Sequence, residues 1–426
     1  MYNVSCVIPV HNGVKYIEDT IRNILSQTLQ NFQIIFVDDW SSDGSVEIIE
    51  RAIAGDDRFI LLPLEENHGA AYCRNYGFSK ACGEYVMFLD SDDIYYPEMF
   101  ERAYVVAVEE NADLVVFGYD INVFDDNETL VRTNSFYPGS YKVYRDGLAS
   151  ISDLDKCDHV PWNKIVRRSA LVESGIRFQE IPANNDVFYS QAIALHAKRI
   201  VFLHEKLIAY YYNRNESLTR YRLKKKKYVL EAFEAVYDYI SLNKYKVTAS
   251  AYMNYMLDFL GYACVYNNRL GMDIRDYTCA FAEKADLRRK LEYEMEKGHL
   301  YGHNVEFAKR LLEQRDLNIL NIYELYKDIL LPGLGCARVN GKKLALWGYG
   351  SRGKELIEWL IANEMMVDYI IDQDINKQGL CIEGKKICSY EAVKDSIDII
   401  WITNSNIFDD IRDFVVDKEL IALDII

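Results

Sequence analysis

The chain has 426 residues, and this length predicts about two or three independently packed domains. Half of the residues are apolar and 27% are charged, which is typical of globular proteins and excludes a long disordered tail. The net charge of -16 disfavours nonspecific binding to nucleic-acid phosphates, so we expect no nucleic-acid partner.

The sequence shows neither a recognisable signal peptide nor a long apolar segment, which indicates the compartment of the protein. A strand-like apolar run at 4–10 stands where a signal peptide would be. No stretch approaches about 18 uninterrupted apolar residues, so we expect no membrane-spanning helix. The nine cysteines are scattered, without a CxxC pair or closely spaced histidines, which favours buried thiols in a reducing compartment over a zinc site. We therefore expect a cytoplasmic protein.

One basic run, RYRLKKKK at 220–227, stands out against the acidic background. Such a run could hold the protein peripherally at the inner, anionic face of a membrane. A solvated loop or helix start is the more frequent meaning of a short charge run.

The N-terminal part of the chain alternates between predicted strands and helices. Each strand is a short, nearly continuous apolar run, which is typical of a parallel sheet covered by helices on both faces. The predicted strands are 4–10, 34–37, 59–62, 85–89 and 114–119, and the helices begin near residues 14, 46 and 70. The expected fold class is therefore α/β.

Polar residues directly follow three of these strands. His11 and Asn12 follow the first, Asp38 and Asp39 end the second, and the sequence DSDD at 90–93 follows the fourth. In open α/β sheets, ligands bind beyond the carboxyl ends of the strands. One crevice could therefore gather these side chains.

The character of the sequence changes after about Tyr221. Residues 228–266 are rich in Tyr, Ala, Leu and Met at helical spacing, and helical patterns continue to about residue 330. The sequence PGLG at 332–335 breaks the pattern, and a new βα series opens at 344. We therefore predict three domains, 1–220, a helical domain at 221–335 and a small α/β domain at 341–426.

The C-terminal domain begins with a glycine-rich turn. A strand, GYGSRG and a helix satisfy the context of a dinucleotide fold, and they resemble small Rossmann-like modules attached to proteins of nucleotide-sugar metabolism. Gly348, Gly350, Gly353 and Asp372 form a candidate site for an NAD-like dinucleotide or another nucleotide. A βα scaffold whose glycines only allow tight packing fits the same pattern.

Two blocks of the N-terminal sequence resemble the family 2 glycosyltransferases, which have the GT-A fold. They are VSCVIPVHNGVKYIEDTIRNILSQTLQNFQIIFVDDWSSDGS and NHGAAYCRNYGFSKACGEYVMFLDSDD, and a looser match extends to about Arg220. The resemblance implies a GT-A nucleotide-sugar-binding domain and a metal-dependent, hexosyltransferase-type enzyme. It also implies transfer from a UDP-sugar to a saccharide or lipid-linked saccharide in cell-surface polysaccharide or glycan biosynthesis.

Asp90 and Asp92 flank Ser91, and in the resemblance all three belong to the nucleotide-sugar site. The donor diphosphate carries negative charge that must be neutralised as the anomeric bond breaks. The spacing brings two carboxylates near one hard cation, Mn²⁺ or Mg²⁺, whose remaining ligands are water and phosphate oxygens. An isolated DSDD would more often be an acidic turn that caps a helix, so the metal-binding interpretation depends on the surrounding block.

The resemblance also assigns residues to the nucleotide. It implies that Asp39 accepts from the edge of a uracil-type base and that Pro9, His11 and Asn12 line the nucleoside. A turn with solvated carboxylates is the alternative at Asp39. Arg74 is a candidate for contacting the nucleotide or orienting the aspartates, but a helical arginine is as often an ordinary salt-bridge partner.

The reaction needs a base that takes the proton of the acceptor hydroxyl, and we expect Asp186 to be this residue. The family usually shows Glu-Asp here, whereas this chain has Asn185-Asp186. A second departure is His68, where many relatives carry Gly. Asp186 as the N-cap of a helix at 187–195 is the alternative. A single displacement with such a base would invert the anomeric configuration.

Three other classes of function fit part of the sequence. An oxidoreductase would use the C-terminal glycine-rich turn, but a substrate domain for it is absent. A nucleotidyltransferase also joins an α/β sheet to paired aspartates, but the sequence lacks its glycine-rich triphosphate loop near the N-terminus. A binding protein without turnover is favoured by Asn185 and opposed by Asp90, Asp92 and Asp186.

Overall fold

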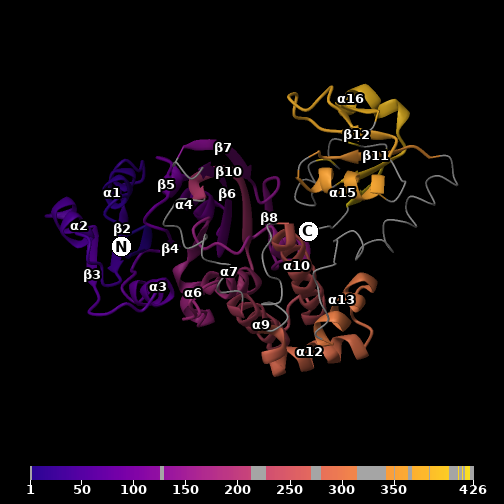
Figure 1. Ribbon diagram of the computed structural model, residues 1–426. Helices are drawn as coiled ribbons and strands as arrows, with labels where there is room; N and C mark the ends of the chain where they lie inside the picture. The colour runs from indigo at the N-terminus through magenta and orange to yellow at the C-terminus, as the bar shows by residue number, and fades with distance from the viewer. Residues whose placement is uncertain are drawn as a thin grey trace. The chain divides into compact units, whose positions relative to one another are not determined.

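The chain forms two compact units, Met1–Ala249 and Ser250–Ile426, each with its own sheet (Figure 1). The computed structural model describes residues 2–124, 129–212, 227–269, 280–313, 342–349, 351–362, 367–382, 384–402, 411, 415 and 418–422.

The first unit contains the predicted βα repeats. Four strands pair in parallel in the order β3-β2-β1-β4. They are β1 (Val4–Val10), β2 (Phe32–Asp38), β3 (Phe59–Pro63) and β4 (Tyr85–Phe88), with helices α1 (Ile17–Leu25), α2 (Ser45–Ile53) and α3 (Ala70–Phe78) between them. The α/β fold class is confirmed, and each of these strands begins and ends within two residues of its predicted bounds.

Beyond β4 the sheet becomes mixed. It continues in the order β9-β6-β10-β5, and β9 runs antiparallel to both β4 and β6. The strands are β5 (Ile94–Tyr95), β6 (Leu114–Phe124), β7 (Leu130–Phe136), β8 (Lys142–Tyr144), β9 (Lys164–Arg167) and β10 (Ile200–Tyr212). The helices are α4 (Met99–Glu109), α5 (Ile151–Asp155), α6 (Arg168–Ser174), α7 (Asn185–His196) and α9 (Lys227–Leu242).

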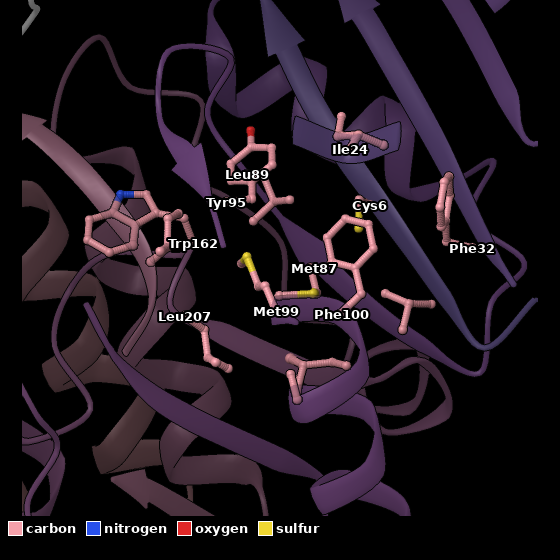
Figure 2. Packing of buried hydrophobic residues seen from close by; sticks show 14 of the residues in the cluster. Cys6, Ile24, Phe32, Met87, Leu89, Tyr95, Met99, Phe100, Trp162 and Leu207 are labelled. Carbon is pink, nitrogen blue, oxygen red and sulfur yellow. The ribbon is translucent and has the colours of Figure 1, made fainter. Parts of the chain in front are cut away.

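One apolar core explains the pattern of the N-terminal elements. All seven residues of β2 are buried, as expected for a strand covered on both faces. On α1, Ile17, Ile21 and Ile24 recur at helical spacing and join Cys6 of β1 and Phe32 of β2 in one cluster. Figure 2 shows Cys6, Ile24 and Phe32 in this cluster. Each such side chain contributes roughly 1.5–3 kcal/mol on burial, so the pattern determines which face of α1 meets the sheet.

Helix α3 approaches the sheet very closely at Gly77. A Cβ on Gly77 would stand 2.4 Å from Cγ1 of Val7 and 3.0 Å from Cγ2 of Val37. The absence of a side chain therefore lets α3 touch β1 and β2 directly. Arg74 lies about one turn nearer the start of the same helix, so this contact also positions Arg74.

The second unit contains helices α10 (Ala249–Arg269), α12 (Ala285–Glu296) and α13 (Gly302–Leu312), and a small sheet. The sheet has the order β13-β14-β12-β11-β15-β16, and apart from the β13–β14 hairpin its pairs are parallel. Its strands are β11 (Leu344–Trp347), β12 (Tyr369–Ile371), β13 (Cys381–Ile382), β14 (Lys385–Cys388), β15 (Ile399–Ile402) and β16 (Glu419–Ala422). Helices α15 (Ser351–Ala362) and α16 (Tyr390–Val393) and the 3₁₀ turn η2 (Lys394–Ser396) connect them.

The parallel strands of this small sheet follow the order of a doubly wound sheet, in which the first strand lies in the middle. The three-domain division at 1–220, 221–335 and 341–426 stays a prediction. Across the part of the chain that the structure describes, every helix is too short or too polar to cross a bilayer.

Candidate functional site

The loops that follow β1, β2 and β4 meet at one edge of the first sheet. Val10 of β1 pairs with Asp38 of β2, and the Asp39 amide donates to the Val10 carbonyl oxygen over 2.7 Å. The Thr20 hydroxyl of α1 donates to the Ser91 carbonyl oxygen over 2.6 Å, which ties the loop after β4 to the helix after β1. The structure therefore brings the polar ends of these three strands together.

Side-chain hydrogen bonds hold the loop after β1 against the loop after β2. His11 Nδ1 lies 2.7 Å from the Asp39 carbonyl oxygen, and His11 Nε2 lies 3.1 Å from Asn12 Nδ2. The Ser42 amide donates to Asn12 Oδ1 over 2.9 Å. His11 and Asn12 are exposed, and Pro9 is half-buried within β1.

The two carboxylates at the end of β2 are buried. Asp39 is 4% exposed, and its two carboxylate oxygens accept the amide protons of His68, over 2.7 Å, and Gly69, over 2.8 Å. Asp38 Oδ2 accepts from the Ser41 amide, while its buried Oδ1 has no hydrogen-bond partner among the described residues. A buried carboxylate is costly unless it is hydrogen-bonded, so Asp39 is not a solvated turn residue and instead holds the loop at His68 in place.

Trp40 was not among the predicted site residues. It follows Asp39 with a left-handed backbone, at φ 62°, and is 60% exposed. That conformation is rare for a bulky residue and persists where the surroundings hold the backbone. The sequence signal that could have identified Trp40 is an aromatic residue inside a turn of aspartates and serines.

His68, the second departure from the family pattern, lies beside α3. Its ring stacks on Tyr72, with ring centroids 4.3 Å apart.

The DSD motif presents carboxylate oxygens at the edge of this cluster. Asp90, Ser91 and Asp92 are half-buried, and the Asp90 side chain is 31% exposed. Asp90 Oδ1 accepts a hydrogen bond from Arg74, and the structure gives no donor to Oδ2 among the described residues. No group of three or more His, Cys, Asp or Glu side chains forms a metal centre among the residues described. A hard cation that takes its other ligands from phosphate and water needs no such group, so these carboxylates fit Mn²⁺ or Mg²⁺.

Arg74 joins the DSD motif to the start of α7. Its side chain is 7% exposed, Nη2 donates to Asp90 Oδ1 over 2.6 Å, and Nη1 donates to Asn185 Oδ1 over 3.3 Å. The guanidinium carbon lies 5.2 Å from the ring centroid of Phe178. Arg74 therefore holds Asp90 and connects two segments that are 111 residues apart in the sequence. Asn185 was noted only as a departure from the family pattern, and the sequence carries no signal of its contact with Arg74.

Asp186 lies in the first turn of α7 and is half-buried. The helix begins at Asn185 with Asn184 as its N-cap, so it starts two residues earlier than predicted and Asp186 is not the cap. A carboxylate in the first turn is stabilised by the positive end of the helix dipole.

Lys164 of β9 is a buried cation close enough to α7 to interact electrostatically with Asp186. It is 1% exposed, and its ammonium donates to the carbonyl oxygen of Val160 over 2.6 Å and to Asn163 Oδ1 over 2.7 Å. Burial lowers the pKa of Lys164 to about 8, while the negative charges of Asp158 and Asp186 oppose the shift. Lys164 therefore holds the loop before β9 in place by donating hydrogen bonds to neutral carbonyl and amide oxygens.

In the second unit the acid of the candidate nucleotide site already has internal partners. The Tyr349 amide, which follows Gly348 (φ 102°), donates to Asp372 Oδ2 over 2.7 Å. Lys377 lies 3.1 Å from the same oxygen, and the Asp374 amide donates to Oδ1 over 2.9 Å. Asp372 is 7% exposed, with two partners on Oδ2 and one on Oδ1. These contacts hold Asp372 against the glycine-rich turn, and a nucleotide site at this position stays a prediction.

Two of the sequence predictions fall wholly or partly outside the described residues. Gly350 lies outside them, while Gly353 is buried on α15. Residues 220–226 of the basic run also lie outside, and α9 begins at Lys227.

The chain has relatives among known proteins. Residues 5–175 match the family model described as glycosyl transferase family 2, and residues 340–423 match one described as C2185-like, N-terminal. Glycosyltransferase GlyG of Streptococcus pneumoniae is 42% identical over 116 residues, which are 27% of this chain and 38% of GlyG. Putative teichuronic acid biosynthesis glycosyltransferase TuaG of Bacillus subtilis is 37% identical over 122 residues, 29% of this chain and 48% of TuaG. The chain thus spans less than two thirds of the length of these relatives.

A solved structure shares the fold. TarS of S. aureus, residues 1–349 in complex with UDP, has a TM-score of 0.55 and 18% sequence identity. The likeness covers 74% of this chain and 91% of that one. At this identity it shows the fold alone, which agrees with the GT-A fold expected from the sequence.

Proposed function

We propose that the chain is an inverting, metal-dependent glycosyltransferase with a UDP-sugar donor, because residues 5–175 match the model of glycosyl transferase family 2. The acceptor we propose is a saccharide or lipid-linked saccharide in cell-surface polysaccharide or glycan biosynthesis. The name of TuaG, which refers to teichuronic acid biosynthesis, supports this acceptor class, and UDP in the TarS structure supports a uridine donor.

One observation carries the proposal, the chain of contacts from the nucleotide loops to the first turn of α7. His11 contacts Asp39, Arg74 forms an ion pair with Asp90, and Arg74 also contacts Asn185, which precedes Asp186. Donor recognition, charge neutralisation and proton removal need three different groups in one place. Hydrogen bonds join His11 to Asp39, and Asp90 through Arg74 to Asn185. Helix α3 connects the two sets, because its N-cap Gly69 donates to Asp39 and Arg74 lies within it.

We propose that Asp90 and Asp92 hold Mn²⁺ or Mg²⁺, and that Ser91 lies beside the donor. When bound, the cation would neutralise charge that develops on the diphosphate oxygen as the anomeric bond breaks. Two observations support this cation site. No donor to Asp90 Oδ2 is found among the described residues, and the DSD motif is only half-buried. Arg74 supplies a fixed positive charge next to the same carboxylate, which orients it before the donor arrives.

Asp186 is the base in this proposal. The acceptor hydroxyl oxygen forms the new bond to the anomeric carbon while the bond from that carbon to the diphosphate oxygen breaks. A carboxylate oxygen of Asp186 takes the hydroxyl proton, and the nucleoside diphosphate leaves with the bonding electrons. Attack from the face opposite the leaving group inverts the configuration.

The nucleoside site that we propose is formed by Pro9, His11, Asn12 and Asp39. The Asp39 carboxylate accepts from two backbone amides and from the Cys73 thiol, and it keeps one lone pair that can accept from a base edge. Because Asp39 also orders the loop at His68, it would align the base and that loop together.

A cytoplasmic location, with peripheral contact between the basic run at 220–227 and the inner face of the membrane, is part of the same proposal. It would bring the protein to a lipid-linked acceptor. An anionic surface is the partner whose charge complements this basic run.

Calorimetric titration with UDP, GDP and NAD⁺, with and without Mn²⁺, tests the donor site. We expect Mn²⁺-dependent binding of UDP that is lost in Asp92→Ala. Asp19→Ala is the matched control, because Asp19 is an exposed acid of α1 paired with Arg22. Binding of NAD⁺ without metal and without any response to a diphosphate would overturn the proposal and assign function to the C-terminal module.

The role of Asp186 is tested separately by Asp186→Asn. This variant should bind UDP as the native chain does but transfer sugar at least about 10²-fold more slowly, the usual range for a lost general base. Transfer at the native rate would rule out Asp186 as the base.

A further inference from the structure

Arg74 has one charged partner and one neutral partner. Among the described residues, Asp90 is the carboxylate within ion-pair distance, with 2.6 Å between Nη2 and Oδ1. The second contact is longer, 3.3 Å from Nη1 to the amide oxygen of Asn185. The guanidinium Nε is buried and has no hydrogen-bond partner in the described part of the chain. The guanidinium therefore depends on Asp90 for compensation of its charge.

Aromatic side chains surround this ion pair on one side. Phe178 faces the guanidinium and stacks on Tyr189, with ring centroids 4.0 Å apart, and Phe88 lies 4.9 Å from Phe178 edge-on. All three rings are buried. Apolar surroundings lower the local dielectric and strengthen the attraction between Arg74 and Asp90. A divalent cation bound at Asp90 must share the carboxylate with this guanidinium.

We propose that Asn185 is a positioning residue that keeps Arg74 on Asp90, so that the DSD motif alone holds a divalent cation weakly. The inference rests on the metal site of the proposed function. A carboxylate at position 185 would give the guanidinium a second anion and release Asp90 toward the cation. With the neutral amide, Asp90 stays paired until the donor diphosphate adds its own negative charge. The site would therefore bind a cation more tightly when the donor is present than when it is absent.

The test measures Mn²⁺ binding by calorimetry, with and without saturating UDP. Asn185→Asp keeps the size of the side chain and adds the charge next to Arg74. We expect it to tighten Mn²⁺ binding about fivefold, the order of effect of one well-placed charge near a half-exposed site. Asn184→Asp is the matched control, because it adds the same charge one residue away, at an N-cap whose side chain makes no cap hydrogen bond. We expect the control to change Mn²⁺ affinity less than about twofold.

A double-mutant cycle with Arg74→Gln shows whether the effect passes through Arg74. The gain in Mn²⁺ affinity from Asn185→Asp should disappear when Arg74→Gln is also present. If Arg74→Gln fails to fold, the Mn²⁺ affinities of Asn185→Asp and Asn184→Asp still test the inference. Equal gains from both, or no gain from Asn185→Asp, would overturn the inference and leave the donor site standing. Failure of the native chain to bind Mn²⁺ with UDP would refute the donor site and this inference with it.

Discussion

Replacing Gly77 with alanine tests how the fold positions Arg74. In an exposed helix this change favours folding by about 1 kcal/mol. At Gly77 the new Cβ would stand 2.4 Å from Cγ1 of Val7 and 3.0 Å from Cγ2 of Val37, both fully buried. Carbon atoms prefer a separation of about 3.5–4.0 Å, so the nearer contact is short by about 1 Å. Overpacking costs about 1–3 kcal/mol, and two rigid β-branched neighbours place this site at or above the upper end. The expected net loss is about 2 kcal/mol.

Thermal unfolding of the full chain by calorimetry measures this loss. About 2 kcal/mol lowers the melting temperature of a unit of this size by roughly 4–8 °C. Because α3 must move outward, Arg74 should withdraw from Asp90. Adding Val7→Ala removes the clashing Cγ1, so the double variant should lose less stability than the sum of the single variants. A melting temperature for Gly77→Ala that is unchanged or higher would refute this reasoning.

Three further predictions concern the first unit. Asp39→Asn turns an amide NH₂ toward the backbone N–H of His68 or Gly69. The free energy of unfolding, measured in urea, should therefore fall by about 1–3 kcal/mol, and UDP affinity should fall as well. A variant as stable as the native chain would contradict the anchoring role of Asp39. Trp40 is 60% exposed, so bound UDP should quench tryptophan emission, and a quench that survives in Trp40→Phe would show that the nucleotide lies elsewhere. Because burial lowers the pKa of Lys164 to about 8 from 10.5, the folded chain binds fewer protons than the unfolded chain between these values. Its stability should therefore rise by up to about 3 kcal/mol from pH 8 to 10.5 relative to Lys164→Met, and parallel pH profiles would count against this.

Local sequence patterns were enough to predict the strands whose ends form the candidate site. The apolar runs predicted at 4–10, 34–37 and 85–89 are buried, so their composition alone indicates strands of a covered parallel sheet. Because parallel strands end at the same edge, the polar residues after them could be grouped without a structure. That argument placed His11, Asp39 and Asp90 at one edge of the sheet.

Only the tertiary structure decided how these groups are connected. The contact between Arg74 and Asn185 spans 111 residues, and no periodic pattern records such a pairing. The partners of Asp39 are backbone amides, which every residue except proline has, so composition cannot identify them. The close approach at Gly77 depends on the side chains that two strands present to the helix. Short-range preferences select elements, whereas the distances between side chains are determined by packing across elements far apart in the sequence.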